Sequence, residues 1–556
     1  MKSDIELAKA ANMLLIKEIA LNLGIPEDDI EQYGKYKAKL PLSLIDEEKI
    51  KKAKLVLVTA MTPTPAGEGK TTTSIGLAQG LNKIGVKATV VIREPSLGPV
   101  FGVKGGAAGG GMSQVLPMED INLHFTGDLS AIEKAHNLLS ALIDNNLQNK
   151  KYSLNLDPRT ITWKRVMDMN DRSLRHVVLG LGGMADGIPR ESGFDITAAS
   201  EVMAILCLSK DLNELKEKLS NIFIGYTFDK KPIYARDLKA QGAMTALLKH
   251  AIKPNLVQTM ENTPALIHGG PFANIAQGTN SLIATKMGLS LSEYVVTEAG
   301  FASDLGAEKF LDIKCQYGGL MPNASVIVAT IRAIKYHGGI KLKELNNPDV
   351  GAIMKGLNNL DKHIENLRHF GLNPIVAINR FTSDTEEEIA AVFAHCNEQG
   401  VKVALNDSWA KGGEGAIDLA KMVVEAADKC STCFKPLYPF SMPIIEKIDT
   451  IAKKMYGAAG VEYSLAARKK LEEITNLNLD ELPVCIAKTQ TSLSDNPALI
   501  GRPKDFIINI RDIEIAAGAG FIVPIAGSIM RMPGLPNIPS SENIDVAEDG
   551  SISGLF

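Results

Sequence analysis

The chain has 556 residues, 45% of them hydrophobic and 22% charged, and its 60 Lys and Arg against 64 Asp and Glu give a formal net charge of -4. This length predicts about three or four domains, and the composition excludes a chain that is disordered throughout. A charge so near zero gives no general attraction to nucleic acid or to an anionic membrane, so we expect neither as a partner.

The N-terminus has the pattern of a folded helix rather than of an export signal. Ser3 and Glu6 stand at capping-box spacing, and no apolar signal core follows a basic start. Apolar stretches elsewhere are four to eight residues long, far below the roughly 20 residues that a membrane-spanning helix needs. The six cysteines are too few and too scattered for a disulfide framework, which favours a reducing compartment. We therefore expect a cytoplasmic protein.

Short runs of Val, Ile and Leu recur along the chain with helix-compatible segments between them. We predict strands over residues 55–58, 88–92, 177–179, 256–257, 294–296, 326–328 and 375–378. Continuous apolar strands are buried on both faces, which is typical of a mainly parallel sheet in an α/β fold. After residue 437 the rhythm weakens, and the runs at 483–486, 506–510 and 513–515 indicate a β-rich C-terminal unit.

A candidate phosphate-binding loop follows the first of these strands. The segment Thr64-Pro65-Ala66-Gly67-Glu68-Gly69-Lys70-Thr71 leads into a helix-compatible run. Strand, Gly-containing loop, Gly-Lys-Thr and helix are the parts of a nucleotide P-loop, so we predict that these eight residues bind ATP. Lys70 would reach the outer phosphates, and the Thr71 hydroxyl would bind Mg²⁺. The loop departs from the usual pattern because Thr64 replaces the first glycine, and a chance Gly-Lys-Thr at a helix start is the alternative.

Two further segments point to an anion at the same edge of the sheet. Arg93 follows the strand 88–92, where an anion-holding arginine is expected, although pairing with a structural carboxylate is the alternative. Residues 102–111 include six glycines, which favours close approach of the backbone to a ligand over a flexible linker. Lys104, Gly105 and Gly106 in this run would bind an anion.

These residues resemble the formate–tetrahydrofolate ligase (formyltetrahydrofolate synthetase) family. The Gly-rich run is similar to the family's first signature, with Met112 where the family has Tyr, and residues 328–339 are similar to its second. Further family-like blocks lie at residues 117–128, 268–274 and 409–415. The resemblance spans the chain, and its length fits a monofunctional ligase without fused dehydrogenase and cyclohydrolase domains.

The resemblance implies a reaction and its substrates. ATP would phosphorylate formate, and N10 of tetrahydrofolate would attack the resulting formyl phosphate to give 10-formyltetrahydrofolate, ADP and phosphate. Lys70 and Arg93 would be the catalytic cations, with Mg²⁺ on the nucleotide. Phe381 and Trp409 would flank the pterin ring, where stacking adds roughly 0.5–1.5 kcal/mol beyond area burial. The family also implies a homotetramer, a polyglutamylated folate and activation by K⁺ or NH₄⁺.

The resemblance and the strand pattern together give a domain division. We expect a P-loop NTPase-like α/β domain at residues 1–368, with a mainly parallel sheet flanked by helices. A smaller α/β domain at 369–460 would contribute to the folate and nucleotide cleft, and a β-rich domain would occupy 461–556. The competing function is a P-loop switch ATPase that controls a partner, which would be indifferent to formate and tetrahydrofolate.

Other residues allow two interpretations each. His124, His268 and His337 lie in the family-like blocks and would either contact substrate or serve as hydrogen-bonded structural histidines. Cys430 and Cys433 have the spacing of a redox or metal pair, but no second pair accompanies them, so we expect ordinary surface residues.

Overall fold

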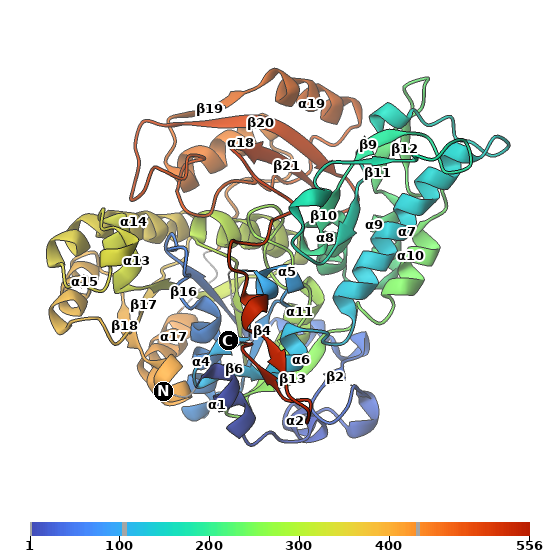
Figure 1. Ribbon diagram of the computed structural model, residues 1–556. Coiled ribbons are helices and arrows are strands. Elements are labelled where there is room, and N and C mark those ends of the chain that lie inside the picture. The colour runs from blue at the N-terminus through green and yellow to red at the C-terminus, as the bar shows by residue number, and fades with distance from the viewer. Residues whose placement is uncertain (1–2, 103–107, 430–433, 556) are drawn as a thin grey trace.

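The computed structural model describes residues 3–102, 108–429 and 434–555. Its centre is a 12-stranded sheet, in which most strands run in the order β1-β2-β13-β14-β4-β15-β3-β16-β17-β18 (Figure 1). The strands that position the site are β14 (Pro264–Ile267), β4 (Ala88–Ile92), β15 (Tyr294–Glu298), β3 (Lys54–Ala60), β16 (Pro322–Ala329), β17 (Ile375–Asn379) and β18 (Val403–Asn406). From β14 to β18 every neighbouring pair is parallel, which confirms the α/β fold.

Helices cover both faces of this sheet, as continuous apolar strands require. In β3, Val56 and Val58 pack in one core with Leu77 of α4 (Lys70–Lys83). The alternate residues Leu55 and Leu57 pack in the other core, which contains α11 (Leu282–Leu291), α13 (Ile331–His337) and α14 (Val350–His369). Because side chains along a strand alternate between faces, one apolar run supplies two cores. α17 (Ile417–Lys429) joins α4 on its face.

Two predicted strands differ from the expectation. Residues 256–257 lie in β13 (Asn255–Thr259), which is antiparallel to β14, so one edge of the sheet is mixed. The run 177–179 is not in the large sheet at all: β8 (Val177–Leu179) pairs with β9 (Arg190–Ser192) in a two-stranded hairpin. Val178 is 59% exposed. The prediction was wrong here because a three-residue apolar run carries too little information to distinguish a buried strand from a surface hairpin.

The segment between β6 (Ser113–Leu116) and β13 forms a lobe beside the sheet, with α7 (Asp128–Gln148), α8 (Glu201–Leu208), α9 (Leu212–Ser220) and α10 (Gln241–Leu248). The C-terminal unit lies above the sheet in Figure 1. It is built on β19 (Gly460–Tyr463), β20 (Ile507–Ala516) and β21 (Phe521–Ala526). The two alternating segments at 506–510 and 513–515 join in the single strand β20. The 483–486 run contributes a bridge from Val484 to Ile522.

The last residues return to the large sheet, so the two ends of the chain lie side by side (Figure 1). Lys9 Nζ donates a 2.8 Å hydrogen bond to the Ile552 carbonyl, and Leu555 is buried in the core that contains α4. The division at 368/369 passes between β16 and β17, which are hydrogen-bonded neighbours. The division at 460/461 falls inside β19. The three-domain division remains a proposal.

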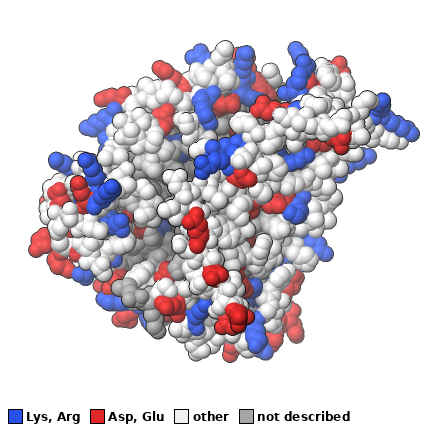
Figure 2. All heavy atoms as spheres, viewed as in Figure 1, with Lys and Arg blue, Asp and Glu red and all other residues white. Residues whose placement is uncertain are grey.

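The surface carries both signs of charge. In Figure 2 small groups of Lys and Arg and of Asp and Glu are scattered over the face shown, in keeping with the small net charge of -4. No helix among the described residues is long and apolar enough to cross a membrane.

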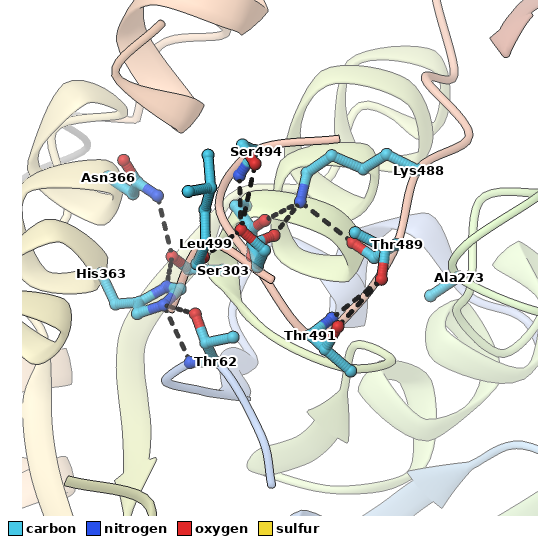
Figure 3. A network of polar contacts seen from close by, with 12 residues as sticks. Thr62, Ala273, Ser303, His363, Asn366, Lys488, Thr489, Thr491, Ser494 and Leu499 are labelled. Atoms are coloured by element: carbon cyan, nitrogen blue, oxygen red, sulfur yellow. Dashed lines mark hydrogen bonds and ion pairs between the residues drawn. The ribbon is translucent and has the colours of Figure 1, made fainter. Parts of the chain in front are cut away.

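A buried polar network fixes the residue that leads into the candidate phosphate loop (Figure 3). The Thr62 amide donates to His363 Nε2 at 2.9 Å, and His363 Nδ1 lies 2.7 Å from the Ser303 hydroxyl. Burial lowers the pKa of His363 to about 3, so the ring is neutral and accepts from Thr62 while it donates to Ser303. Next to Ser303, Asp304 pairs with Lys488 at 2.8 Å. The C-terminal unit is thereby connected to the end of β3.

Candidate functional site

The candidate phosphate loop joins β3 to the first turn of α4. Gly67 and Gly69 adopt left-handed backbone conformations with φ of +84° and +73°, which glycine adopts without strain. Gly69 is the N-cap of α4, whose first residue is Lys70. The N–H groups and the dipole of a helix N-terminus favour an anion. The predicted strand, loop and helix are confirmed as conformations, and the bound phosphate stays a prediction.

The side chain of Glu68 is buried inside the loop. It is 3% exposed, and its Oε1 accepts a 2.6 Å hydrogen bond from the Thr64 amide. The Thr330 hydroxyl at the start of α13 bonds the other carboxyl oxygen. Burial raises the pKa of Glu68. The carboxyl group thus connects Thr64, at the start of the loop, to Thr330 at the start of α13.

Glu298 brings the loop and Arg93 together. It ends β15, the strand between β3 and β4, and is 2% exposed. Its Oε2 accepts a 2.9 Å hydrogen bond from the Thr71 hydroxyl, and its Oε1 lies 3.9 Å from Arg93 Nη2. Arg93 Nη1 also donates to the Pro271 carbonyl at 3.1 Å. Arg93 therefore has both a structural carboxylate partner and a place beside the loop.

Glu298 was not among the site residues predicted from the sequence. A signal was present, because this acid stands two residues after the predicted strand 294–296, at the edge of the sheet where ligands bind. A hydroxyl and a carboxylate are oxygen ligands of the kind that Mg²⁺ takes, so Thr71 and Glu298 fit the magnesium ion of a bound nucleotide. Lys104, Gly105 and Gly106, predicted to bind an anion, lie outside the described residues.

A cavity of about 670 Å³ adjoins the loop. Phe381 and Trp409 both border it, with 37% and 42% of their surface exposed. The remaining lining comes from the start of α4 and from the residues that follow β17 and β18: Gly69, Thr72, Asn379, Arg380, Thr382, Asp384, Asn406, Asp407, Ser408 and Ala410. The Arg332 guanidinium lies 5.5 Å from the centre of the Phe381 ring. Two exposed aromatic rings at one cavity are suited to a flat heteroaromatic ligand.

Gly111 and Met112, at the described end of the Gly-rich run, contact the backbone of Trp409. The Met112 amide donates a 2.8 Å hydrogen bond to the Trp409 carbonyl. Gly111 has a φ of +58°, and a Cβ there would lie 2.0 Å from that carbonyl oxygen. Close backbone approach was expected, but at Gly111 the partner is the chain's own backbone. This packing explains the glycine without a ligand.

Two of the three candidate histidines are structural. His268 Nε2 lies 2.6 Å from the Ala251 carbonyl and its Nδ1 lies 2.6 Å from the Ser281 hydroxyl. His337 contacts the Thr62 carbonyl through Nε2 and the Gly501 amide through Nδ1. Burial lowers the pKa of each to about 4, so both rings are neutral and fully hydrogen-bonded. His124 is exposed and borders a separate cavity of about 410 Å³.

The cysteines offer no reactive thiol in the described chain. Cys430 and Cys433 lie outside the described residues. Cys207, Cys315, Cys396 and Cys485 are free and buried, and burial raises the pKa of the Cys485 thiol to about 11. Between residues 3 and 555, apart from the undescribed segments, no group of three or more His, Cys, Asp or Glu is placed to hold a metal. A cavity of about 540 Å³ under β20 and β21 contains none of the predicted site residues.

The chain matches a known family over nearly its whole length. The family model described as "Formate--tetrahydrofolate ligase" matches residues 2–556 of this chain. The match covers the loop, Arg93, Glu298 and both aromatic residues of the cavity.

Proposed function

The chain belongs to the formate–tetrahydrofolate ligase family, which ligates formate to tetrahydrofolate with ATP, and we propose that this protein catalyses the ligation through a formyl phosphate intermediate. The observation that carries this proposal is that one cavity adjoins both the candidate phosphate loop and the two exposed aromatic rings. Gly69 and Thr72 belong to the phosphate loop and its helix, and Phe381 and Trp409 are the exposed aromatic residues. All four line the same cavity of about 670 Å³. A phosphorylated intermediate formed at the loop would lie beside the nucleophile.

In the first step a formate oxygen attacks the γ-phosphorus of ATP. An O–P bond to formate forms, the bond to the bridging oxygen breaks, and ADP leaves with the electron pair. Formate is a weak nucleophile and the transferred group carries spread negative charge, so positioning and cationic donors supply the catalysis. Lys70 at the start of α4 and Arg93 after β4 hold that group, and Glu298 holds Arg93 in place. Mg²⁺ bound with the nucleotide would neutralise phosphate charge beside Thr71.

In the second step N10 of tetrahydrofolate attacks the formyl carbon. A C–N bond forms, the C–O bond to phosphate breaks, N10 loses its proton, and inorganic phosphate leaves with the former formate oxygen. Phe381 and Trp409 would orient the pterin ring by stacking. We include in the proposal a polyglutamylated folate, a monovalent cation such as K⁺ or NH₄⁺, a homotetramer and a cytoplasmic location.

Omission of each substrate in turn separates this function from that of a P-loop switch ATPase. Purified protein is assayed for ADP with ATP and Mg²⁺, and with formate and tetrahydrofolate added singly and together. The ligase should form ADP in proportion to 10-formyltetrahydrofolate and only in the complete mixture. A switch ATPase should hydrolyse ATP equally in all mixtures. Lys70→Ala, prepared identically, controls for contaminating ATPases and should lose more than about 100-fold in turnover.

A further inference from the structure

Two buried asparagines line the cavity that Phe381 and Trp409 border, next to the phosphate loop. Asn379 ends β17 and Asn406 ends β18, and they are 9% and 3% exposed. Both border the 670 Å³ cavity. The strands are parallel neighbours in which these two residues are directly paired. Their side chains thus meet at the carboxyl edge of the sheet, where ligands of such sheets bind.

The hydrogen-bond partners fix the orientation of both amides. Asn379 Nδ2 lies 2.7 Å from the Glu68 carbonyl and 3.4 Å from the Gly69 carbonyl, and carbonyl oxygens only accept. Asn379 Oδ1 is therefore the acceptor on the other side, where it receives the Thr73 hydroxyl at 2.8 Å and Asn406 Nδ2 at 2.6 Å. Asn406 must present its NH₂ group to Asn379, so its own oxygen faces elsewhere.

This orientation leaves the side-chain oxygen of Asn406 without a hydrogen-bond donor in the described part of the chain. Asn406 Oδ1 is buried and has no hydrogen-bond partner among the described residues. A buried acceptor without a partner is unfavourable by an amount comparable to a lost hydrogen bond. Asn379, by contrast, has both ends of its amide satisfied. The acceptor without a partner therefore belongs to Asn406, a residue that lines the cavity.

We propose that Asn406 Oδ1 accepts a hydrogen bond from an N–H group of the reduced pterin ring, and that Asn379 connects this contact to the phosphate loop. The proposal rests on the proposed function, because that places tetrahydrofolate between Phe381 and Trp409. Asn406 is then a specificity-determining residue, which selects rings that present a donor at this edge. Aromatic stacking alone does not distinguish such rings.

Asn379 gives this contact a second consequence. Its amide holds the carbonyls of Glu68 and Gly69, the two residues directly before Lys70. A Cβ at Gly69 would lie 2.8 Å from Asn379 Nδ2, so the loop and the amide are in tight contact. A ring bound to Asn406 is therefore connected to the loop through Asn379. Binding of tetrahydrofolate and of nucleotide should therefore be reciprocally coupled, with Asn379 as the positioning residue.

Calorimetric titration of three variants tests this assignment. Asn406→Ser removes the amide oxygen but keeps a hydroxyl on a shorter side chain, and Asn406→Ala removes every polar group of the side chain. Asn358→Ala, on the exposed side of α14, is the matched control. The titrants are tetrahydrofolate and a non-hydrolysable ATP analogue with Mg²⁺. We expect Asn406→Ser to weaken tetrahydrofolate roughly 10- to 100-fold, with the analogue changed less than about threefold and the control unchanged. Melting temperatures report folding, and Asn406→Ala substitutes if the Ser variant is unstable.

Coupling is measured with Asn379→Ala. In the wild type the dissociation constant of tetrahydrofolate should change when the analogue is saturating, and in Asn379→Ala that change should vanish. Unaltered tetrahydrofolate binding in Asn406→Ser, with a clear loss in Trp409→Ala, would overturn the assignment and leave the folate site intact. If neither variant affected tetrahydrofolate, the ring would lie elsewhere and the proposed function would fail at that point. Coupling that persists in Asn379→Ala would remove its positioning role.

Discussion

The Thr71 hydroxyl donates a 2.9 Å hydrogen bond to Glu298 Oε2, across 227 positions of the chain. The contact exists because β15, which ends at Glu298, lies between β3 and β4 in the sheet. The same carboxyl group approaches Arg93 Nη2 at 3.9 Å. One buried acid therefore positions both the hydroxyl suited to Mg²⁺ and the cation assigned to the transferred phosphoryl group.

Glu298→Gln keeps the size of this side chain but removes its charge. We expect kcat to fall roughly 10- to 100-fold, as is typical when a group that orients metal ligands is changed, and a higher Mg²⁺ concentration to be needed for half-maximal activity. Steady-state rates over a Mg²⁺ titration measure both. If kcat fell but the Mg²⁺ dependence did not change, Glu298 would position only Arg93 and would have no role at the Mg²⁺ site.

Arg93→Lys retains the charge and loses the planar fork that binds phosphoryl oxygens in pairs. Loss of one such preorganised donor typically reduces kcat about 100- to 1,000-fold. Binding of the ATP analogue should change little, because Lys70 and the end of α4 remain. Calorimetry and turnover on one preparation distinguish the two effects. Near-normal turnover would leave Arg93 as a partner of Glu298 only.

Trp409→Ala should weaken tetrahydrofolate by roughly 1–3 kcal/mol, the range found for a stacked planar ring. The ATP analogue should lose much less affinity. Phe228→Ala is the control, since Phe228 is also an exposed aromatic residue, 56% accessible, and does not line the cavity. A selective loss for the nucleotide would move Trp409 to the ATP site.

Buried neutral histidines predict a loss of stability in acid. The pKa of His268 is lowered to about 4 from an ordinary value near 6.5, so between these pH values the unfolded chain binds a proton that the folded chain does not. Stability from this group is present above pH 6.5 and is lost as the pH falls toward 4. Glu201, whose pKa burial raises to about 7, acts in the opposite direction.

A single substitution isolates the histidine contribution. His268→Asn should be less stable than the wild type at pH 7, but acidification to pH 5 should destabilise it less, by roughly 1–2 kcal/mol. Denaturant unfolding of both proteins at the two pH values measures this difference. Equal losses in the two proteins would mean that His268 is protonated in the folded state.

The sequence predicted those parts of the fold that depend on local pattern. Residues 88–92, 294–296 and 326–328 are central strands because their apolar runs serve two cores, and Lys70 begins a helix because Gly69 caps it. The run 177–179 is equally apolar but forms an exposed hairpin. Its environment depends on distant neighbours that a three-residue window does not reveal.

The candidate site was predicted where a motif lies within one segment and missed where strands bring distant residues together. Lys70 and Thr71 follow from their loop. Glu298, Asn379 and Asn406 end three separate strands, and their roles depend on the order β4-β15-β3-β16-β17-β18. The histidines show the converse: His268 and His337 lie in family-like blocks, but their partners Ala251 and Thr62 show them to be structural.

Transfer of oxygen from formate tests the central claim most directly. Formate labelled with ¹⁸O is turned over with ATP and tetrahydrofolate, and the inorganic phosphate is analysed by mass spectrometry. Attack of formate on the γ-phosphorus followed by attack of N10 on the formyl carbon requires one formate oxygen to appear in each phosphate released. Formation of 10-formyltetrahydrofolate with unlabelled phosphate would contradict a formyl phosphate intermediate and leave Arg93 without the role assigned to it.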